Sequence, residues 1–336
     1  MSSTALADRG VAPRAGGVRR LFVAWQDPET RSITPVGCLI RRQASDGETF
    51  EFYYLRRARQ LSRFRPFVGF PSLGESYQAA SLFPFFENRI MPRTRGDYGD
   101  YVGSLGLPVD ADPFEILARS EGRRATDTIE VFPEPSLEDG TVTCRFLVHG
   151  VRHIPGAQDV IDGLSIGETL CVLPDPQNDF DKLAVLLSTG DHRLVGYIPA
   201  YLTSLIHRPL DDYGPDAVQV NVEHIGDRGG PSHLRLLCRL VARWPDNVPP
   251  LGGPDFEPLG SEDVVIAKFV LTKDSAGKFV LMEEGSTGKY HFRVLDAKGQ
   301  VIASSESYES KASALKGMES VKRNAPRTED DNQTEG

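Results

Sequence analysis

The sequence contains few cysteines and no long apolar run, and each absence excludes a class of protein. The four cysteines, Cys38, Cys144, Cys171 and Cys238, are widely spaced and form no CxxC pair, so we expect buried, reduced thiols and no disulfide framework. No segment reaches the roughly 20 apolar residues that span a membrane, and residues 1–17 lack the apolar stretch of a signal peptide. We therefore expect a cytoplasmic protein.

An excess of positive charge is also lacking. Lysine and arginine number 38 against 47 aspartates and glutamates, which gives a formal net charge of −9 at pH 7. This charge argues against a protein that coats nucleic acid non-specifically, because such binding depends on clustered Lys and Arg. It remains compatible with a small site that binds one nucleic-acid end.

Breaks in composition divide the chain into three ordered units. With 336 residues and 40% hydrophobic content, the chain can form two or three domains, and its mixed strand and helix patterns predict a multidomain α+β protein. We expect a flexible leader (1–17), a first unit (18–134), a second unit (141–246), a Pro/Gly-rich linker (247–263), a third unit (264–325) and a disordered tail (326–336).

The second unit has the pattern of a small β-barrel or sandwich. Its apolar runs have strand length and are separated by Gly, Pro, Asn and Asp; they lie at 146–148, 169–173, 183–187 and 194–198. The loop at 175–182, with the sequence DPQNDFDK, carries more hydrogen-bonding groups than a plain connection requires. A binding pocket is therefore expected at this loop.

Three motifs of this unit resemble the HIRAN domain over roughly 141–244. They are GVRH at 150–153, DPQNDFDKLAV at 175–185 and VGYIP at 195–199. The family occurs in fork-remodelling helicases and in stand-alone bacterial proteins, and its OB-like β-barrel holds the 3′ end of single-stranded DNA. The resemblance implies a DNA-binding site formed by Arg152, His153, Asn178, Phe180, Asp181 and Lys182.

The chemistry of these residue types fits a strand end. Phe180 and His153 offer stacking faces, and base stacking on an aromatic ring is worth ~1–3 kcal/mol. Asp181 can accept a hydrogen bond from a 3′ hydroxyl, while Arg152 and Lys182 can contact phosphate. An alternative stays open, in which Asn178 and Asp181 only shape a turn and Arg152 pairs with Asp181 at the surface.

The first unit opens with strands and continues with short helices. The patterns predict strands at 21–25, 37–41 and 49–55 and helices at 79–89, 98–105 and 113–120. The runs VGCL at 36–39, PFFENRIMP at 84–92 and DPFEIL at 112–117 resemble the N-terminal subdomain of HipA-type kinases. Because the HIRAN-like unit stands where the kinase core would follow, we expect no kinase activity and no enzyme.

The first unit also contains a cluster of arginines interleaved with Phe64 and Phe67. The cluster consists of Arg56, Arg57, Arg59, Arg63 and Arg65. Cations mixed with aromatic rings suit backbone phosphates and stacked bases, so the cluster is a possible backbone track for DNA. The alternative is a solvated charged face.

The third unit resembles the small YegP-like ββα domain. The resemblance covers 288–326, and the patterns predict strands at 267–273, 278–282, 290–296 and 301–305 and a helix at 310–324. Related domains occur in tandem or as dimers, so a single copy could support a homodimer through a sheet edge or helix face. A packing appendage on the same chain is the alternative.

These observations predict a non-catalytic protein that binds single-stranded DNA at 3′ ends, in DNA repair, replication or defence against foreign DNA. A helicase, a nuclease or a HipA-type kinase is the expected kind of protein partner, and the alternative function is that of a regulator of a HipA-type kinase. We expect no cofactor. We also expect no zinc, because His149 and His153 share no helical face and have no third ligand near in sequence.

Overall fold

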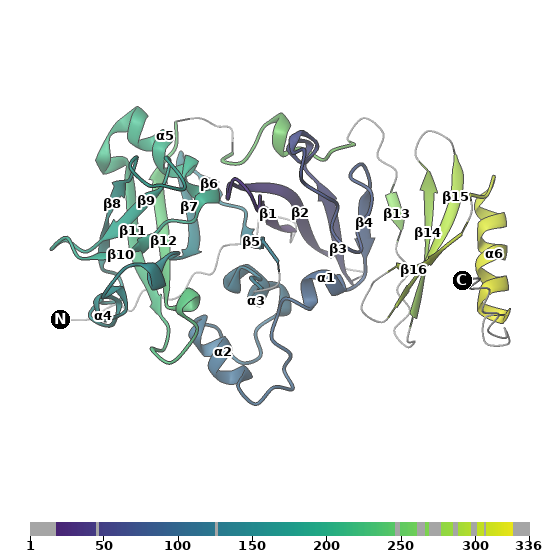
Figure 1. Cartoon of the computed structure of the whole chain (residues 1–336), viewed down its shortest axis with the longest axis horizontal. Helices are drawn as coiled ribbons and strands as arrows, with labels where there is room; N and C mark the ends of the chain where they lie inside the picture. The colour runs from purple at the N-terminus through teal and green to yellow at the C-terminus, as the bar shows by residue number, and fades with distance from the viewer. Residues whose placement is uncertain are drawn as a thin grey trace, which may run out of the picture.

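A computed structural model describes residues 18–44, 47–124, 127–245, 249–260, 266–268, 277–284, 288–296, 301–305 and 307–324. Three sheets follow one another along the long axis of the molecule (Figure 1). The second unit lies at one end, the first unit is central and the third unit lies at the other end. Among the described strands, pairing is antiparallel except between β13 and β4. The expected multidomain α+β fold is confirmed.

The first unit is built on a sheet of order β13-β4-β3-β2-β1-β5. Its strands are β1 (Val18–Gln26), β2 (Ile33–Ala44), β3 (Gly47–Tyr54), β4 (Ser76–Ala79) and β5 (Ile129–Pro133). The three predicted strands of this unit correspond to β1, β2 and β3. One face of the sheet packs on an aromatic core that includes Phe52, Phe70, Phe86 and Phe114.

Two of the three helices predicted in the first unit are confirmed. The helical segments are η1 (Arg56–Gln60), α1 (Pro84–Glu87), α2 (Tyr98–Ser104) and α3 (Pro113–Ser120). Oδ1 of Asp112 accepts a hydrogen bond from the Phe114 amide at 2.8 Å, so α3 begins at a capped residue followed by Pro113. The helix predicted at 79–89 is wrong, because residues 76–79 pair with β3 and Pro84 begins only a four-residue helix.

The second unit is a sheet of order β10-β9-β8-β11-β12-β7-β6. Its strands are β6 (Ser136–Glu138), β7 (Thr141–Leu147), β8 (Thr169–Pro174), β9 (Val185–Ser188), β10 (Leu194–Tyr197), β11 (Val218–Ile225) and β12 (Leu236–Arg243). The connections contain η2 (Val151–His153), α4 (Ala157–Asp162), η3 (Ala200–Leu202), α5 (Ser204–Tyr213), η4 (Pro215–Ala217) and η5 (Ser232–Leu234).

An OB-like β-barrel was expected here, and the described residues of this unit form no closed barrel. The sheet has two different edges, β10 and β6, and it is therefore open. The chain beyond β7 approaches β10 through one isolated bridge, between His149 and Tyr197. Gly150, with a φ of 71°, turns the chain away into η2 directly after this bridge, so no ladder develops.

The first and second units share a hydrophobic core. Phe22 and Phe132 of the first unit belong to the same buried cluster as Phe146 and Tyr201 of the second. The rings of Phe132 and Tyr201 stack with centroids 4.0 Å apart and planes 13° apart. The connection at 134–140, expected to separate the units, contains β6, which pairs with β7.

The chain returns to the first unit after β12. It forms η6 (Pro254–Phe256), in which the Phe256 ring lies edge-on to Phe22 at 6.0 Å. The amide of Leu259 then donates to the Tyr54 carbonyl at 2.8 Å. The first unit therefore holds the second unit at both of its ends.

The third unit contains a three-stranded sheet covered by a helix (Figure 1). Its elements are β13 (Ile266–Lys268), β14 (Gly277–Glu284), β15 (Lys289–Asp296), β16 (Val301–Ser304) and α6 (Lys311–Asn324). The last three predicted strands and the helix are confirmed. Of the first predicted strand, at 267–273, residues 269–273 lie outside the described residues, while 267 and 268 belong to β13, which runs parallel to β4 of the first unit. None of the helices in the described ranges is long and apolar enough to cross a bilayer.

The cysteines are unpaired. Cys38, Cys144 and Cys238 are buried, and Cys171 is half-buried. Burial raises the pKa of the Cys38 and Cys144 thiols to about 12. These thiols are therefore protonated at neutral pH.

Candidate nucleic-acid interface

The polar loop between β8 and β9 is closed by regular strand pairing. Pro174 pairs with Val185, and the Asp175 amide donates to the Ala184 carbonyl at 2.8 Å. These contacts fix both ends of the loop on the sheet. Its residues 176–183 therefore project from a rigid base.

Asn178 and Asp181 give this loop its shape. Oδ1 of Asn178 accepts hydrogen bonds from the amides of Phe180 at 3.0 Å and Asp181 at 3.1 Å. Oδ1 of Asp181 accepts from the Leu183 amide at 2.9 Å, and Nζ of Lys182 donates to the Asn178 carbonyl at 2.8 Å. The sequence left open an alternative in which Asn178 and Asp181 shape a turn. That part of the alternative is observed, since both side chains accept hydrogen bonds within the turn.

Phe180 is the exposed aromatic ring of the loop. It is 81% exposed, and Leu183 and Leu173 beside the loop are also exposed. Since Asn178 fixes the Phe180 backbone, the ring is presented to solvent from an ordered position. Exposed apolar side chains that gather in one place are typical of binding surfaces.

Arg152 and His153 lie on η2, and both side chains are exposed. Nε of Arg152 donates to Nε2 of His153 at 3.0 Å. The Arg152–Asp181 pair that the sequence left open does not occur among the described contacts. The guanidinium is thus held beside the imidazole, and Arg152 forms no ion pair with a carboxylate of the described residues.

Tyr197 joins the two halves of the site. Its backbone exchanges two hydrogen bonds with His149, at 2.9 and 2.8 Å, just before η2. Its hydroxyl donates to Oδ2 of Asp175 at 3.3 Å, and Nδ2 of Asn178 donates to that same oxygen at 3.3 Å. Tyr197 and Asp175 were not predicted as site residues, although both lie inside the motifs that carried the HIRAN resemblance.

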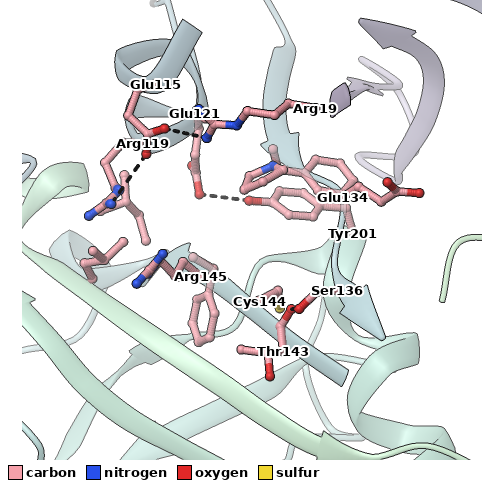
Figure 2. Close-up of a pocket in the computed structure, with 16 residues that line it drawn as sticks. Arg19, Glu115, Arg119, Glu121, Glu134, Ser136, Thr143, Cys144, Arg145 and Tyr201 are labelled. Atoms are coloured by element: carbon pink, nitrogen blue, oxygen red, sulfur yellow. Dashed lines mark hydrogen bonds and ion pairs between the residues drawn. The ribbon is translucent and has the colours of Figure 1, made fainter. Parts of the chain in front are cut away.

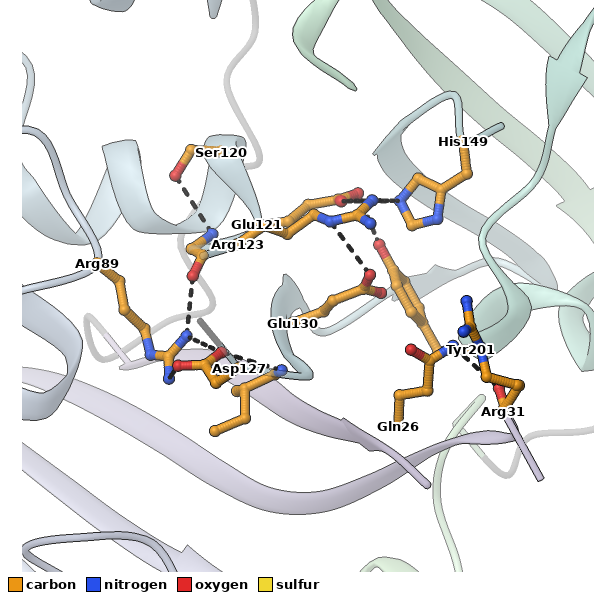
Figure 3. Close-up of polar contacts among 12 residues, drawn as sticks. Gln26, Arg31, Arg89, Ser120, Glu121, Arg123, Asp127, Glu130, His149 and Tyr201 are labelled. Carbon is orange, nitrogen blue, oxygen red and sulfur yellow. Dashed lines mark hydrogen bonds and ion pairs between the residues drawn. The ribbon is translucent and has the colours of Figure 1, made fainter. Parts of the chain in front are cut away.

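His149 connects this site to the first unit. Figure 3 shows its imidazole against Glu121, with Nε2 and Oε2 at 2.8 Å. The hydroxyl of Tyr201 donates to the other oxygen of Glu121 at 2.8 Å, and Nη1 of Arg123 lies 3.2 Å from Nε2 of His149. Nε of Arg123 forms an ion pair with Glu130 at 3.3 Å. A buried polar network therefore crosses the boundary between the two units.

The charges of this network shift the pKa values of its members. Burial alone would lower the pKa of the His149 imidazole, but Glu121 and Glu130 outweigh it and raise that pKa. Burial alone would raise the pKa of the Glu121 carboxyl, but His149, Arg123 and Tyr201 outweigh it and lower that pKa. Opposite charges on His149 and Glu121 thus stabilise each other.

The boundary also encloses a cavity of about 40 Å³, lined by charged side chains (Figure 2). Glu115 forms ion pairs there with Arg19 and, at 3.7 Å, with Arg119. The volume holds at most a few water molecules. This cavity is therefore part of the packed interface and is too small for a nucleotide.

The arginine cluster of the first unit does not present the expected mixture of cations and rings. Phe64 and Phe67 are buried in the aromatic core, so the prediction that they interleave with the arginines at the surface is wrong. Arg63 forms ion pairs with Asp27 and Glu29, and the guanidinium of Arg57 lies 4.8 Å from the Phe256 ring centre.

The remaining arginines of the cluster contact neighbouring residues or lie exposed at the surface. Arg56 forms an ion pair with Glu257 at 3.4 Å, and Nη1 of Arg65 donates to the Ser62 carbonyl at 2.9 Å. Arg59 is exposed on η1 and lines a cleft with Leu73 and Leu259. A role of these arginines as a backbone track stays a prediction.

Two family profiles match this chain. The HIRAN domain profile matches residues 141–244, and the profile described as a domain of unknown function, DUF1508, matches residues 286–330. These matches support the HIRAN and YegP-like resemblances. The HipA-type resemblance of the first unit has no such support and stays a prediction.

Individual proteins match parts of the chain. A UPF0339 protein of Treponema denticola is 51% identical over 51 residues, which is 15% of this chain and 86% of that protein. The UPF0339 protein YegP of Yersinia pestis is 44% identical over 45 residues, 13% of this chain and 40% of that protein. The crystal structure of the HIRAN domain of human HLTF aligns at 17% identity with 32% of this chain and 81% of its own, with a TM-score of 0.24. The chain therefore contains a HIRAN domain at residues 141–244 and, through its C-terminal unit, belongs to the UPF0339 family.

Proposed function

We propose that the HIRAN domain of this chain binds the free 3′ end of single-stranded DNA and that the protein acts without catalysis, in DNA repair, replication or defence against foreign DNA. The observation that carries the proposal is the 81% exposure of Phe180 on a loop that Asn178 holds in one conformation. A ring presented in this way can stack on an unpaired base at ~1–3 kcal/mol, whatever the base. The site supplies an aromatic stacking face, a hydrogen-bond acceptor and positive charge, which are the groups that binding of a DNA strand end requires.

Asp181 is the residue proposed to select an end. Its Oδ1 accepts from the Leu183 amide, while Oδ2 has no donor among the described residues. Oδ2 can therefore accept a hydrogen bond from a terminal 3′ hydroxyl. A 3′ phosphate would place negative charge against the carboxylate and would be repelled. Arg152 would contact the last phosphodiester of the strand.

The test is binding of a labelled oligonucleotide of about 12 nucleotides, measured by fluorescence anisotropy. Phe180→Ala should weaken binding by about 5- to 100-fold, the equivalent of ~1–3 kcal/mol. Ile166→Ala is the matched control, because Ile166 is also strongly exposed in the same domain, and it should leave affinity unchanged. Asp181→Asn should abolish the preference for a 3′ hydroxyl over a 3′ phosphate, whereas Asp179→Asn in the same loop should keep it. Equal affinity of the wild type for the two ends would refute the proposal.

A further inference from the structure

A basic groove of about 250 Å³ lies between the first unit and the HIRAN domain. The segment after α1, α2 and the chain after α3 form its wall on the first unit, and η5 forms its wall on the HIRAN domain. The lining includes Arg89, Arg95, Arg123, Arg124 and His233, and none of the described residues that line it is a carboxylate. Asp127, Asp97 and Glu130 lie just outside the lining and pair with Arg89, Arg95 and Arg123, so Arg124 is the lining arginine for which the described residues supply no ion pair.

The arginines of this groove differ in how firmly they are held. Arg89 is buried and structural, because it forms a bidentate pair with Asp127, at 3.1 and 2.7 Å, and its guanidinium lies 4.6 Å from the Phe85 ring centre. Arg124 is exposed, and the side chain of Arg95 is 58% exposed. Arg95 pairs only with the equally accessible Asp97, and such surface pairs are worth little, so a phosphate can replace the carboxylate.

The groove lies beside one residue of the proposed strand-end site. His233 lies on η5, and η5 packs against η2, the segment that carries Arg152. Burial lowers the pKa of the His233 imidazole, and the nearby charges of Arg123 and Arg152 lower it further. Arg123 of the groove and Arg152 of the HIRAN site are therefore both close to this histidine.

We propose that this groove binds the phosphate backbone of the single strand whose 3′ end occupies the HIRAN site. The strand would leave that site past Arg152 and His233 and cross the boundary between the two units over Arg124 and Arg95. Guanidinium groups bind phosphate oxygens in bidentate fashion, which suits a backbone contact without base specificity. The volume is just below the ~300 Å³ at which small-molecule sites begin, so the groove fits a passing backbone better than an enclosed ligand. This inference rests on the proposed function of the HIRAN domain.

The experiment compares two lengths of 3′-hydroxyl oligonucleotide, about 4 and about 16 nucleotides, at several salt concentrations. Only the longer strand reaches the groove. Arg95→Ser/Arg124→Ser should bind the short strand like the wild type and the long strand more weakly, with the log–log salt slope for the long strand reduced by about 1.4, or ~0.7 for each lost phosphate contact. Arg31→Ser/Arg239→Ser removes the same charge from exposed positions outside both the groove and the arginine cluster, and it should change neither.

Each other outcome is decisive. If Arg95→Ser/Arg124→Ser keeps the salt slope, the affinity and the end preference of the wild type, strand binding in the groove is refuted and the proposed function still stands. Equal losses of affinity for the long strand in both double variants would reveal a general charge effect and would also refute strand binding in the groove. A wild type that does not distinguish 3′ hydroxyl from 3′ phosphate would remove the end site, and with it the strand path. Thermal melts of the variants show whether a loss of binding reflects a loss of folding.

Discussion

The hydroxyl of Tyr197 donates to Oδ2 of Asp175 at 3.3 Å, and this contact ties the tip of β10 to the base of the polar loop. The same tyrosine pairs through its backbone with His149, directly before η2. One residue thus sets the relative position of the exposed ring of Phe180 and the cation of Arg152.

Tyr197→Phe should test this connection, because it removes the hydroxyl and keeps the ring and the backbone pairing. We expect a loss of about 0.5–1.5 kcal/mol in the free energy of unfolding, as for a typical hydrogen bond. We also expect several-fold weaker binding of a 3′-hydroxyl oligonucleotide, because the loop is less firmly held. Tyr213→Phe, on the half-exposed surface of α5, is the control for urea denaturation and anisotropy. Full affinity in Tyr197→Phe would show that the loop is positioned without this contact.

Gly196→Ala should break the bridge between β10 and His149. A Cβ atom at this position would lie 2.3 Å from Cγ1 of Val148 and 2.7 Å from the His149 carbonyl oxygen, so the backbone has to move. Strained overpacking of this kind typically costs ~1–3 kcal/mol. Gly190→Ala, which has nothing within 4 Å, is the matched control. A Gly196→Ala protein that melts and binds like Gly190→Ala would contradict the described packing.

The His149 network predicts a pH dependence of stability. Because the folded pKa of His149 is raised, the imidazolium contributes stability that is complete below the unfolded-chain pKa of about 6.5 and is lost as the pH rises through the folded value. The free energy of unfolding of the wild type should therefore fall as the pH rises above about 6.5. In Glu121→Gln/His149→Gln this fall should be smaller, because both charges are gone.

Urea denaturation at a series of pH values measures this difference. The tryptophans Trp25 and Trp244 report unfolding of the first unit and of the HIRAN domain. Parallel pH profiles of the two proteins would show that another group causes the dependence.

The sequence predicted much of the local structure. Alternating apolar runs located β1, β2 and β3, and the runs bounded by Gly, Pro and Asp located β8, β9 and β10 to within a few residues. Asp112 followed by Pro113 marked the start of α3, because a capping side chain and a proline at the first helical position act locally. The turn residues of the loop at 175–182 could also be predicted, because Asn178 forms hydrogen bonds within its own segment.

The sequence did not predict what depends on distant contacts. Phe64 and Phe67 stand among arginines in the sequence, yet tertiary packing turns both rings into the core. The helix α5 contains Pro209, a residue that argues against a helix interior, and it was not predicted. Glu121 and His149 are 28 residues apart on different units, so no local pattern marks their contact. The missing barrel closure has a similar cause, because it depends on where Gly150 directs the chain.

The path of the chain through the first unit determines how a pull on bound DNA would spread through the protein. The HIRAN domain leaves the central sheet at β5 and comes back to it through η6 and Leu259, so it is held at two points on one body. A load applied at Phe180 would be carried by the stacked rings of Phe132 and Tyr201 and by both attachments together. The HIRAN domain and the first unit would therefore move as one body, and tension in the DNA strand would displace the central sheet together with the domain.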